Sequence, residues 1–73
     1  MSGNKKKIQA TIGVNIKSAR LKSGLTQSEV ARKAKISTNH YARIERGEIN
    51  ASIETLEAIL EVLKVKSSKI LPF

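Results

Sequence analysis

The fold of this chain is decided by residues 26–47, which read TQSEVARKAKISTNHYARIERG. The stretch opens with a capping box. The Thr26 hydroxyl can accept a hydrogen bond from the amide of Glu29, and the Glu29 carboxylate can reach back to the amide of Thr26. A short helix is therefore predicted from this cap to about Ala34.

A second start signal follows almost at once. Ser37 is a favourable N-cap residue only three positions after Ala34, and Gly47 is typical of the position just past a helix end. The second helix is predicted to run to about Arg46. Two short helices joined by so tight a turn must cross at a steep angle, because the chain cannot fold back antiparallel. The stretch is therefore predicted to form a helix-turn-helix.

Three further helices are predicted around this pair. Before it, Ile12, Ile16 and Ala19 fall on one helical face, and Gly24 ends that helix. After it, Ser52 caps a helix whose apolar positions are Ile53, Leu56, Ile59, Leu60 and Leu63. A last short turn is predicted at residues 67–71. The prediction is an all-α, compact five-helix bundle with the helix-turn-helix at its centre.

Charge is distributed unevenly along the chain. The formal net charge is +8, yet residues 1–47 hold eleven basic and two acidic side chains, a net of +9, and residues 48–73 hold three and four, a net of −1. This asymmetry suits a polyanion on one side and a protein contact on the other, although a merely solvated basic face is the alternative. Residues 1–7 are predicted to be a flexible basic tail, and residues 8–73 a single domain.

Several function classes are disfavoured by composition. The chain has no cysteine and one histidine, so we expect no disulfide, no metal site and no cofactor. No catalytic set can be assembled convincingly, so the protein is not expected to be an enzyme. No signal-peptide or membrane-spanning pattern is found, and we expect a cytoplasmic protein. One tyrosine and one phenylalanine give no stacking platform for single-stranded RNA.

The second helix of the pair has two different faces. At 100° per residue, Tyr41 and Ile44 face the core with the cap residue. The opposite face holds Asn39, Ala42, Arg43 and Arg46, with Thr38 at its edge. Asparagine can pair bidentately with adenine, arginine with guanine, and small apolar groups can meet the thymine methyl. Asn39 and Arg43 are therefore predicted to read bases with help from Thr38, the alternative being an ordinary solvated face.

The segment from Thr26 to Gly47 resembles the Cro and phage-repressor family of helix-turn-helix proteins, also called the xenobiotic-response-element type. The likeness covers nearly the whole chain from Ile12 onward. The IERG ending looks especially like the controller proteins of restriction–modification systems. The resemblance implies a lambda-repressor-like fold and a transcriptional regulator that binds double-stranded DNA. Two positions depart from the family pattern, namely Lys35, where glycine is frequent, and Tyr41, where valine or isoleucine is usual.

The resemblance also implies roles for residues around the second helix. Gln27 matches a glutamine that grips the DNA backbone, and Lys35, Arg46 and Asn50 are further candidates for phosphate contacts. Arg20 and Glu45 match positions that form an internal ion pair in the family. That pair would hold the recognition helix at a fixed angle, so Arg20 is not expected to contact DNA.

One recognition helix reads too few base pairs to select a site, so a homodimer on a palindromic operator is predicted. Its interface is expected at Val65, Leu71 and Phe73, whereas Ile70 is expected to be internal. RNA polymerase is a candidate further partner. The antitoxin of a toxin–antitoxin pair is the alternative function, and co-purification of a second small protein would favour it.

Overall fold

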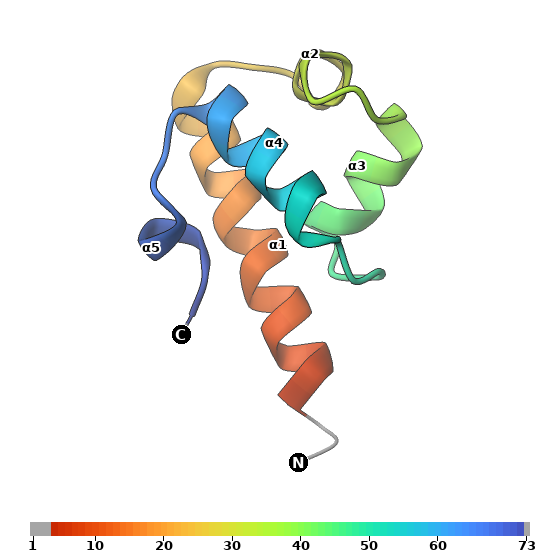
Figure 1. Ribbon diagram of the computed structural model, residues 1–73, viewed down its shortest axis with the longest axis vertical. Coiled ribbons are helices and arrows are strands. Elements are labelled where there is room, and N and C mark those ends of the chain that lie inside the picture. Colours follow the sequence, from red (N-terminus) through yellow and green to blue (C-terminus); the bar gives the residue numbers. More distant parts are fainter. Residues whose placement is uncertain (1–3, 73) are drawn as a thin grey trace.

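The computed structural model describes residues 4–72, and in these residues it contains five α-helices (Figure 1). In chain order they are α1 (Asn4–Ser23), α2 (Gln27–Lys33), α3 (Thr38–Glu45), α4 (Ile53–Leu63) and α5 (Ser67–Ile70). No strand occurs within this part of the chain, so the all-α prediction is confirmed. No helix in residues 4–72 is both long and apolar enough to cross a membrane.

Polar caps begin three of these helices where the sequence predicts them. The capping box is complete, because the Glu29 amide donates to the Thr26 hydroxyl at 3.0 Å and the Thr26 amide donates to the Glu29 carboxylate at 2.9 Å. The Ser37 hydroxyl accepts from the amide of His40 at 3.0 Å at the start of α3. Ser52 accepts from the amide of Thr55 at 3.1 Å at the start of α4. Each cap satisfies an amide that has no partner inside its helix.

Four helices end on a residue in the left-handed conformation. These residues are Gly24, Lys35, Gly47 and Lys64, with φ of 73°, 62°, 72° and 57°. After α2, the amide of Ile36 donates to the Ala31 carbonyl at 3.0 Å and the amide of Lys35 to the Arg32 carbonyl at 3.1 Å. This pair of bonds is the Schellman arrangement, which satisfies carbonyls at a helix end. Glycine takes this conformation readily, whereas lysine is strained by its Cβ.

Lys35→Gly is expected to raise the free energy of unfolding by roughly 0.5–1 kcal/mol, because relief of Cβ strain outweighs the greater freedom of glycine in the unfolded chain. Urea denaturation followed by circular dichroism measures the change. Lys35→Ala removes the same charge but keeps a Cβ, and so should bring no such gain. An equal gain in both variants would assign the effect to charge instead of backbone strain.

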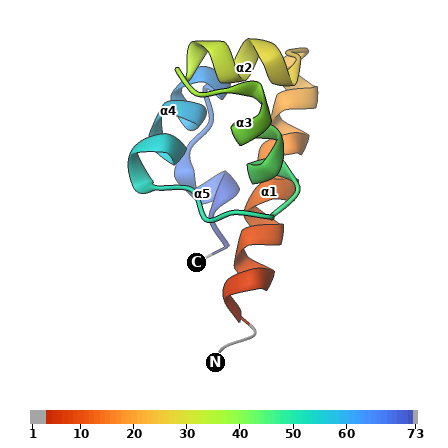
Figure 2. The ribbon, with the colours of Figure 1, turned by 90° about the vertical axis from the view of Figure 1, so that its right-hand side faces the viewer.

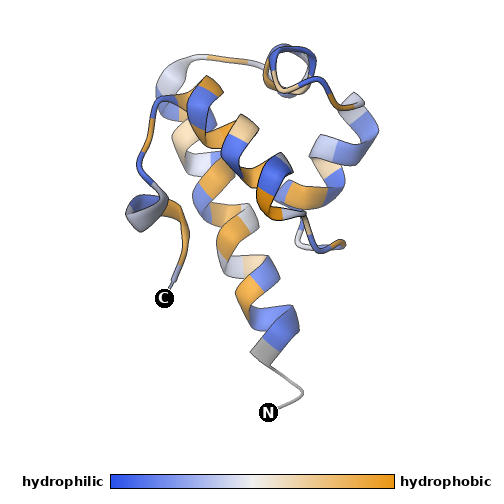
Figure 3. Cartoon of the chain, viewed as in Figure 1, coloured by the Kyte–Doolittle hydropathy of each residue, from blue (hydrophilic) through white to orange (hydrophobic). Residues whose placement is uncertain are grey.

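The hydrophobic core lies where all five helices meet. Its most deeply buried side chains are Ile16 from α1, Val30 from α2, Tyr41 from α3, Ile59 from α4 and Ile70 from α5. Ile70 is therefore internal, as predicted. Helix α1 packs against α3, α4 and α5, while α2 packs against α3 and α4 (Figure 2). Hydrophobic and hydrophilic residues alternate along α1 and α4, as expected for helices with one face in the core (Figure 3).

Two expectations about the helices are corrected. Helix α1 begins at Asn4, so residues 4–7 belong to the helix and not to the predicted tail. Lysine has a high helix propensity, and nothing between Lys5 and Ile12 interrupts the helix. Residues 1–3 of that tail lie outside the described residues. Ile53, which the sequence pattern predicts to lie in the apolar stripe of α4, is 72% exposed. The buried stripe is centred on Leu56, Ile59 and Leu63, so Ile53 lies at its margin.

Candidate nucleic-acid interface

The outward face of α3 carries the residues predicted to read bases. Thr38 and Asn39 occupy its first turn and Arg43 lies one turn later, and all three are exposed. Asn39 and Arg43 are four residues apart, so their side chains lie on the same face of the helix. A helix of this length, presenting an amide and a guanidinium on one side, fits the dimensions of the major groove.

Ala42 does not belong to the outward face of α3, contrary to the prediction. The helical wheel predicts an outward position for Ala42, but this residue is 9% exposed and belongs to the buried residues. The buried side of α3 is wider than the helical wheel predicts, because α3 packs against both α1 and α2. A methyl group that is hidden in this way is not available to a thymine.

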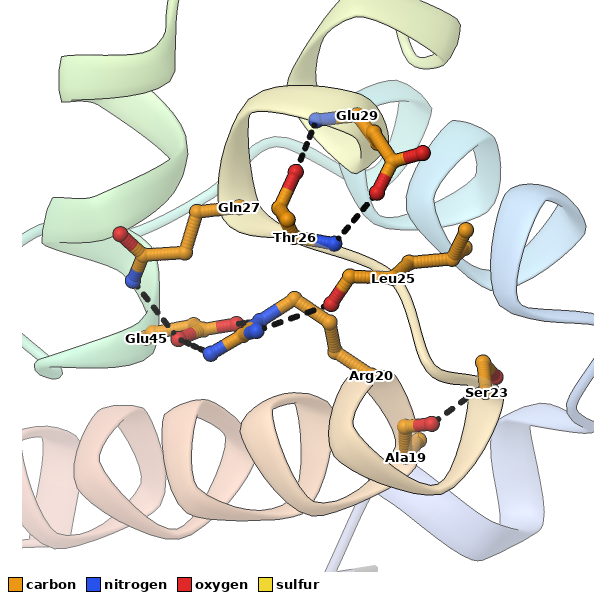
Figure 4. Close-up of polar contacts among 8 residues, drawn as sticks. All are labelled: Ala19, Arg20, Ser23, Leu25, Thr26, Gln27, Glu29 and Glu45. Atoms are coloured by element: carbon orange, nitrogen blue, oxygen red, sulfur yellow. Dashed lines mark hydrogen bonds and ion pairs between the residues drawn. The ribbon is translucent and has the colours of Figure 1, made fainter.

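The other side of α3 is fixed by a buried ion pair, which the resemblance implied (Figure 4). Arg20 Nε donates to Glu45 Oε2 at 2.7 Å and Arg20 Nη2 donates to Oε1 at 3.2 Å. The residues are 9% and 6% exposed. Arg20 Nη1 also donates to the Leu25 carbonyl at 3.0 Å, so one guanidinium links α1, the α1–α2 turn and α3. Arg20 is thus engaged inside the protein.

Gln27 has a partner that the sequence analysis did not identify. Its Nε2 donates to Glu45 Oε1 at 2.9 Å, so α2 is tied to α3 through the same carboxylate (Figure 4). Burial by itself raises the pKa of Glu45, but hydrogen bonds from Arg20 and Gln27 outweigh that effect and leave the pKa below its ordinary value. The carboxylate therefore stays ionised at neutral pH. The predicted phosphate contact of Gln27 stays a prediction.

Tyr41 lies fully buried beside this pair. Burial raises the pKa of its phenol, and Glu45 raises it further, so the group stays protonated. No hydrogen-bond partner of its hydroxyl is found among residues 4–72. A ring at this position fills the space that a smaller aliphatic side chain would leave between α3 and the rest of the core.

The predicted phosphate contacts surround α3. Lys35 lies in the turn before α3, Arg46 caps its C-terminal end and Asn50 lies in the α3–α4 loop, and all three are exposed. Arg46 is not free, because its Nε donates to Glu48 Oε2 at 2.6 Å. Arg43 Nε is 3.5 Å from Glu48 Oε1. Glu48 was missed by the sequence analysis, since its spacing from Arg43 is not a helical one.

The predicted dimer residues differ in how they are placed. Val65 and Leu71 are half-buried and pack against the core from outside, whereas Phe73 lies outside the described residues. Val65 also lines an open cavity of about 370 Å³ between α1 and the C-terminal segment. Asn15 Nδ2 donates to the Ile70 carbonyl at 2.9 Å and so ties that segment to α1.

Comparisons with known proteins agree with this architecture. The sequence model of the helix-turn-helix family matches residues 16–70. Over 60 residues, 82% of the chain, the protein is 42% identical to an immunity repressor protein of Bacillus phage phi105, and it spans 42% of that repressor's length.

Two solved structures share the fold. The clp gene regulator ClgR of Corynebacterium glutamicum is 24% identical with a TM-score of 0.83, over 86% of this chain and 82% of that one. The restriction–modification controller protein C.AhdI of Aeromonas hydrophila is 19% identical with a TM-score of 0.83, over 86% of this chain and 96% of that one. With the family match extending over most of the sequence, this chain belongs to the helix-turn-helix family, in its Cro and repressor type.

Proposed function

We propose that the protein is a sequence-specific regulator that binds double-stranded DNA as a homodimer on a palindromic operator. The observation that carries the proposal is the two-sided construction of α3. Its inner side is tied to α1 and α2 through Glu45, while Asn39 and Arg43 on its outer side are exposed. A recognition helix needs both properties, because base readout depends on side chains held at a fixed depth and angle in the groove.

The homodimer follows from the limited reach of one recognition helix. Paired motifs of this type place two such helices about 34 Å apart, one helical turn of DNA, and read an inverted repeat. We place the contact between protomers at the C-terminal end, where Val65 and Leu71 are only half-buried, with Phe73 as its third member. The likeness to a controller protein favours restriction–modification control as the finer form of this proposal.

Asn39→Ala and Arg43→Ala are expected each to cost about 1–3 kcal/mol of binding free energy on the preferred site, and to relax the preference at one defined base position per half-site. The reason is that each side chain offers two hydrogen bonds that match one base. Selection and sequencing of a random duplex pool, carried out with wild type and both variants at one salt concentration, measures the change.

Lys35→Ala is the matched control for this experiment. It removes a cation that is predicted to touch phosphate. The affinity of the variant for DNA should therefore fall to a similar degree on all sequences, while its base preference stays the same. Wild-type selection should yield an inverted repeat with half-sites about ten base pairs apart. A pool without sequence bias, combined with binding that vanishes steeply with salt, would contradict the proposed function.

A further inference from the structure

One carboxylate lies among the cations of the proposed DNA-binding face. Glu48 follows Gly47, whose left-handed conformation turns the chain back toward the end of α3. The Glu48 amide donates to the Arg43 carbonyl at 3.0 Å, which fixes the backbone of this turn. The Glu48 side chain then reaches two arginines that the helix by itself places on its outward side. Glu48 and both arginines are about half exposed, at 46%, 47% and 54% of their side-chain surface.

The contact with Arg46 uses the edge of the guanidinium that a phosphate would use. Arg46 Nε donates to Glu48 Oε2 at 2.6 Å, and Arg46 Nη2 approaches Oε1 at 3.4 Å. Phosphate binds arginine bidentately through pairs of N–H groups in the same manner. The hydrogen bond from Arg46 lowers the pKa of Glu48, and Arg43 lowers it further, so the carboxylate is ionised at neutral pH.

We infer that Glu48 competes with DNA for two arginines, with a phosphate for Arg46 and with a base edge for Arg43, and thereby lowers the affinity of this face for any duplex. The inference rests on the proposed function. Each contact must be given up before its arginine can engage DNA, and the carboxylate also repels the incoming phosphates. Because these ion pairs are exposed, each is weak and is easily displaced. The competition by Glu48 therefore limits binding to DNA of arbitrary sequence, but it does not prevent binding to a site that supplies good base contacts.

The competition has a signature in the salt dependence of binding. An arginine already neutralised by a carboxylate gains less from replacing it with a phosphate than a free arginine does. Fewer counterions are then released per complex, and binding depends less steeply on salt. Removal of Glu48 should therefore both tighten binding and increase the slope of log K against log salt concentration.

Glu48→Gln is expected to bind a short random-sequence duplex about fivefold more tightly than wild type at moderate salt, with a salt slope steeper by about one. Fluorescence anisotropy with a labelled duplex over a salt series measures both quantities. Glu61→Gln is the matched control. It removes the same charge from an exposed residue near the far end of α4, and no ion pair of Glu61 is found among residues 4–72. It should stay within about twofold of wild type.

A double replacement separates competition from simple repulsion. In an Arg46→Gln background, Glu48→Gln should lose most of its effect, because the main contact it releases is already gone. Equal tightening by the Glu48 and Glu61 variants would overturn the inference and leave net charge as the cause. Weaker binding by Glu48→Gln would also overturn it, since the carboxylate would then be positioning the arginines. Thermal unfolding of each variant checks that all are folded.

Duplex binding by the wild-type protein distinguishes a failure of the proposed function from a failure of the inference on Glu48. If wild type binds no duplex at all, the proposed function is wrong and the inference is overturned with it. If wild type binds and selects a site but Glu48→Gln binds no more tightly, the proposed function stands and the inference alone is wrong.

Discussion

Replacement of Glu45 by alanine is expected to lower the free energy of unfolding by about 3–5 kcal/mol. The side chain accepts two hydrogen bonds from Arg20 and one from Gln27, and it is almost completely buried. Its removal leaves the Arg20 guanidinium in the interior, where the Leu25 carbonyl is the one remaining hydrogen-bond partner found among residues 4–72. A buried charge without its counter-charge is among the most costly defects in a folded protein.

The loss would be large for so small a domain. At roughly 0.05–0.15 kcal/mol per residue, a chain of this length is stabilised by about 4–11 kcal/mol in total. Urea denaturation followed by circular dichroism measures the change, with Glu57→Ala on the exposed side of α4 as the control. The control should remain within about 0.5 kcal/mol of wild type. A loss below about 1 kcal/mol in Glu45→Ala would mean that the pair is not coupled to folding.

Two further results distinguish the ion pair from a general packing defect. Arg20→Met combined with Glu45→Leu should recover much of the stability, because neither charge is then left buried alone. The pH dependence has a defined sign. Because the pKa of Glu45 is lowered on folding, its contribution is complete above the ordinary value of 4.5 and is lost as the pH falls through the folded pKa. Glu45→Gln should therefore show a shallower loss of stability in acid than wild type.

Gly13→Ala is expected to destabilise the protein by about 2–3 kcal/mol, although alanine is the better helix former by about 1 kcal/mol. Gly13 lies inside α1 where that helix crosses the C-terminal end of α3. A Cβ placed there would lie 2.6 Å from the Ile44 carbonyl oxygen and closer still to that of Glu45. Both obstacles are backbone atoms, so the contact can be relieved only by moving one helix away from the other.

The same displacement should reach the proposed DNA-binding face. Because α3 carries the proposed base-reading side chains, Gly13→Ala should also weaken binding to a selected site by more than the loss of folded protein explains. Ser18→Ala, at an exposed position of α1, is the control for helix propensity and should be neutral or slightly stabilising. Denaturation and anisotropy measurements on both variants test this. A more stable Gly13→Ala protein would show that α1 and α3 can separate at no cost.

Local signals in the sequence were sufficient to place the helices of the central motif. Thr26, Ser37 and Ser52 all cap helices in the structure, and Gly24 and Gly47 both end them. These signals act over three or four residues, so they are visible without knowledge of the rest of the fold. Lys35 and Lys64 are the exceptions, because they follow α2 and α4 in a left-handed conformation without a glycine to predict it.

The resemblance to a known family predicted more of the tertiary contacts than the periodicity of the sequence did. It implied the ion pair between Arg20 and Glu45, residues that lie 25 positions apart and share no local pattern. It did not reveal that Gln27 donates to the same carboxylate, or that Ala42 is covered. Both depend on how closely α2 and α1 approach α3, and a helical wheel contains no information on distances between helices.

The sequence by itself determined the helix order, the caps and turns that bound the central pair, and the outward position of Asn39 and Arg43, because each depends on the spacing of residues within one helix or turn. Only the tertiary structure decided which side chains meet across elements. It showed that Gly13 is required by a close helix crossing, that Ile53 falls outside the core, and that the turn at Gly47 brings Glu48 onto two arginines. These contacts follow from the distances and angles between packed helices, which the core fixes as a whole.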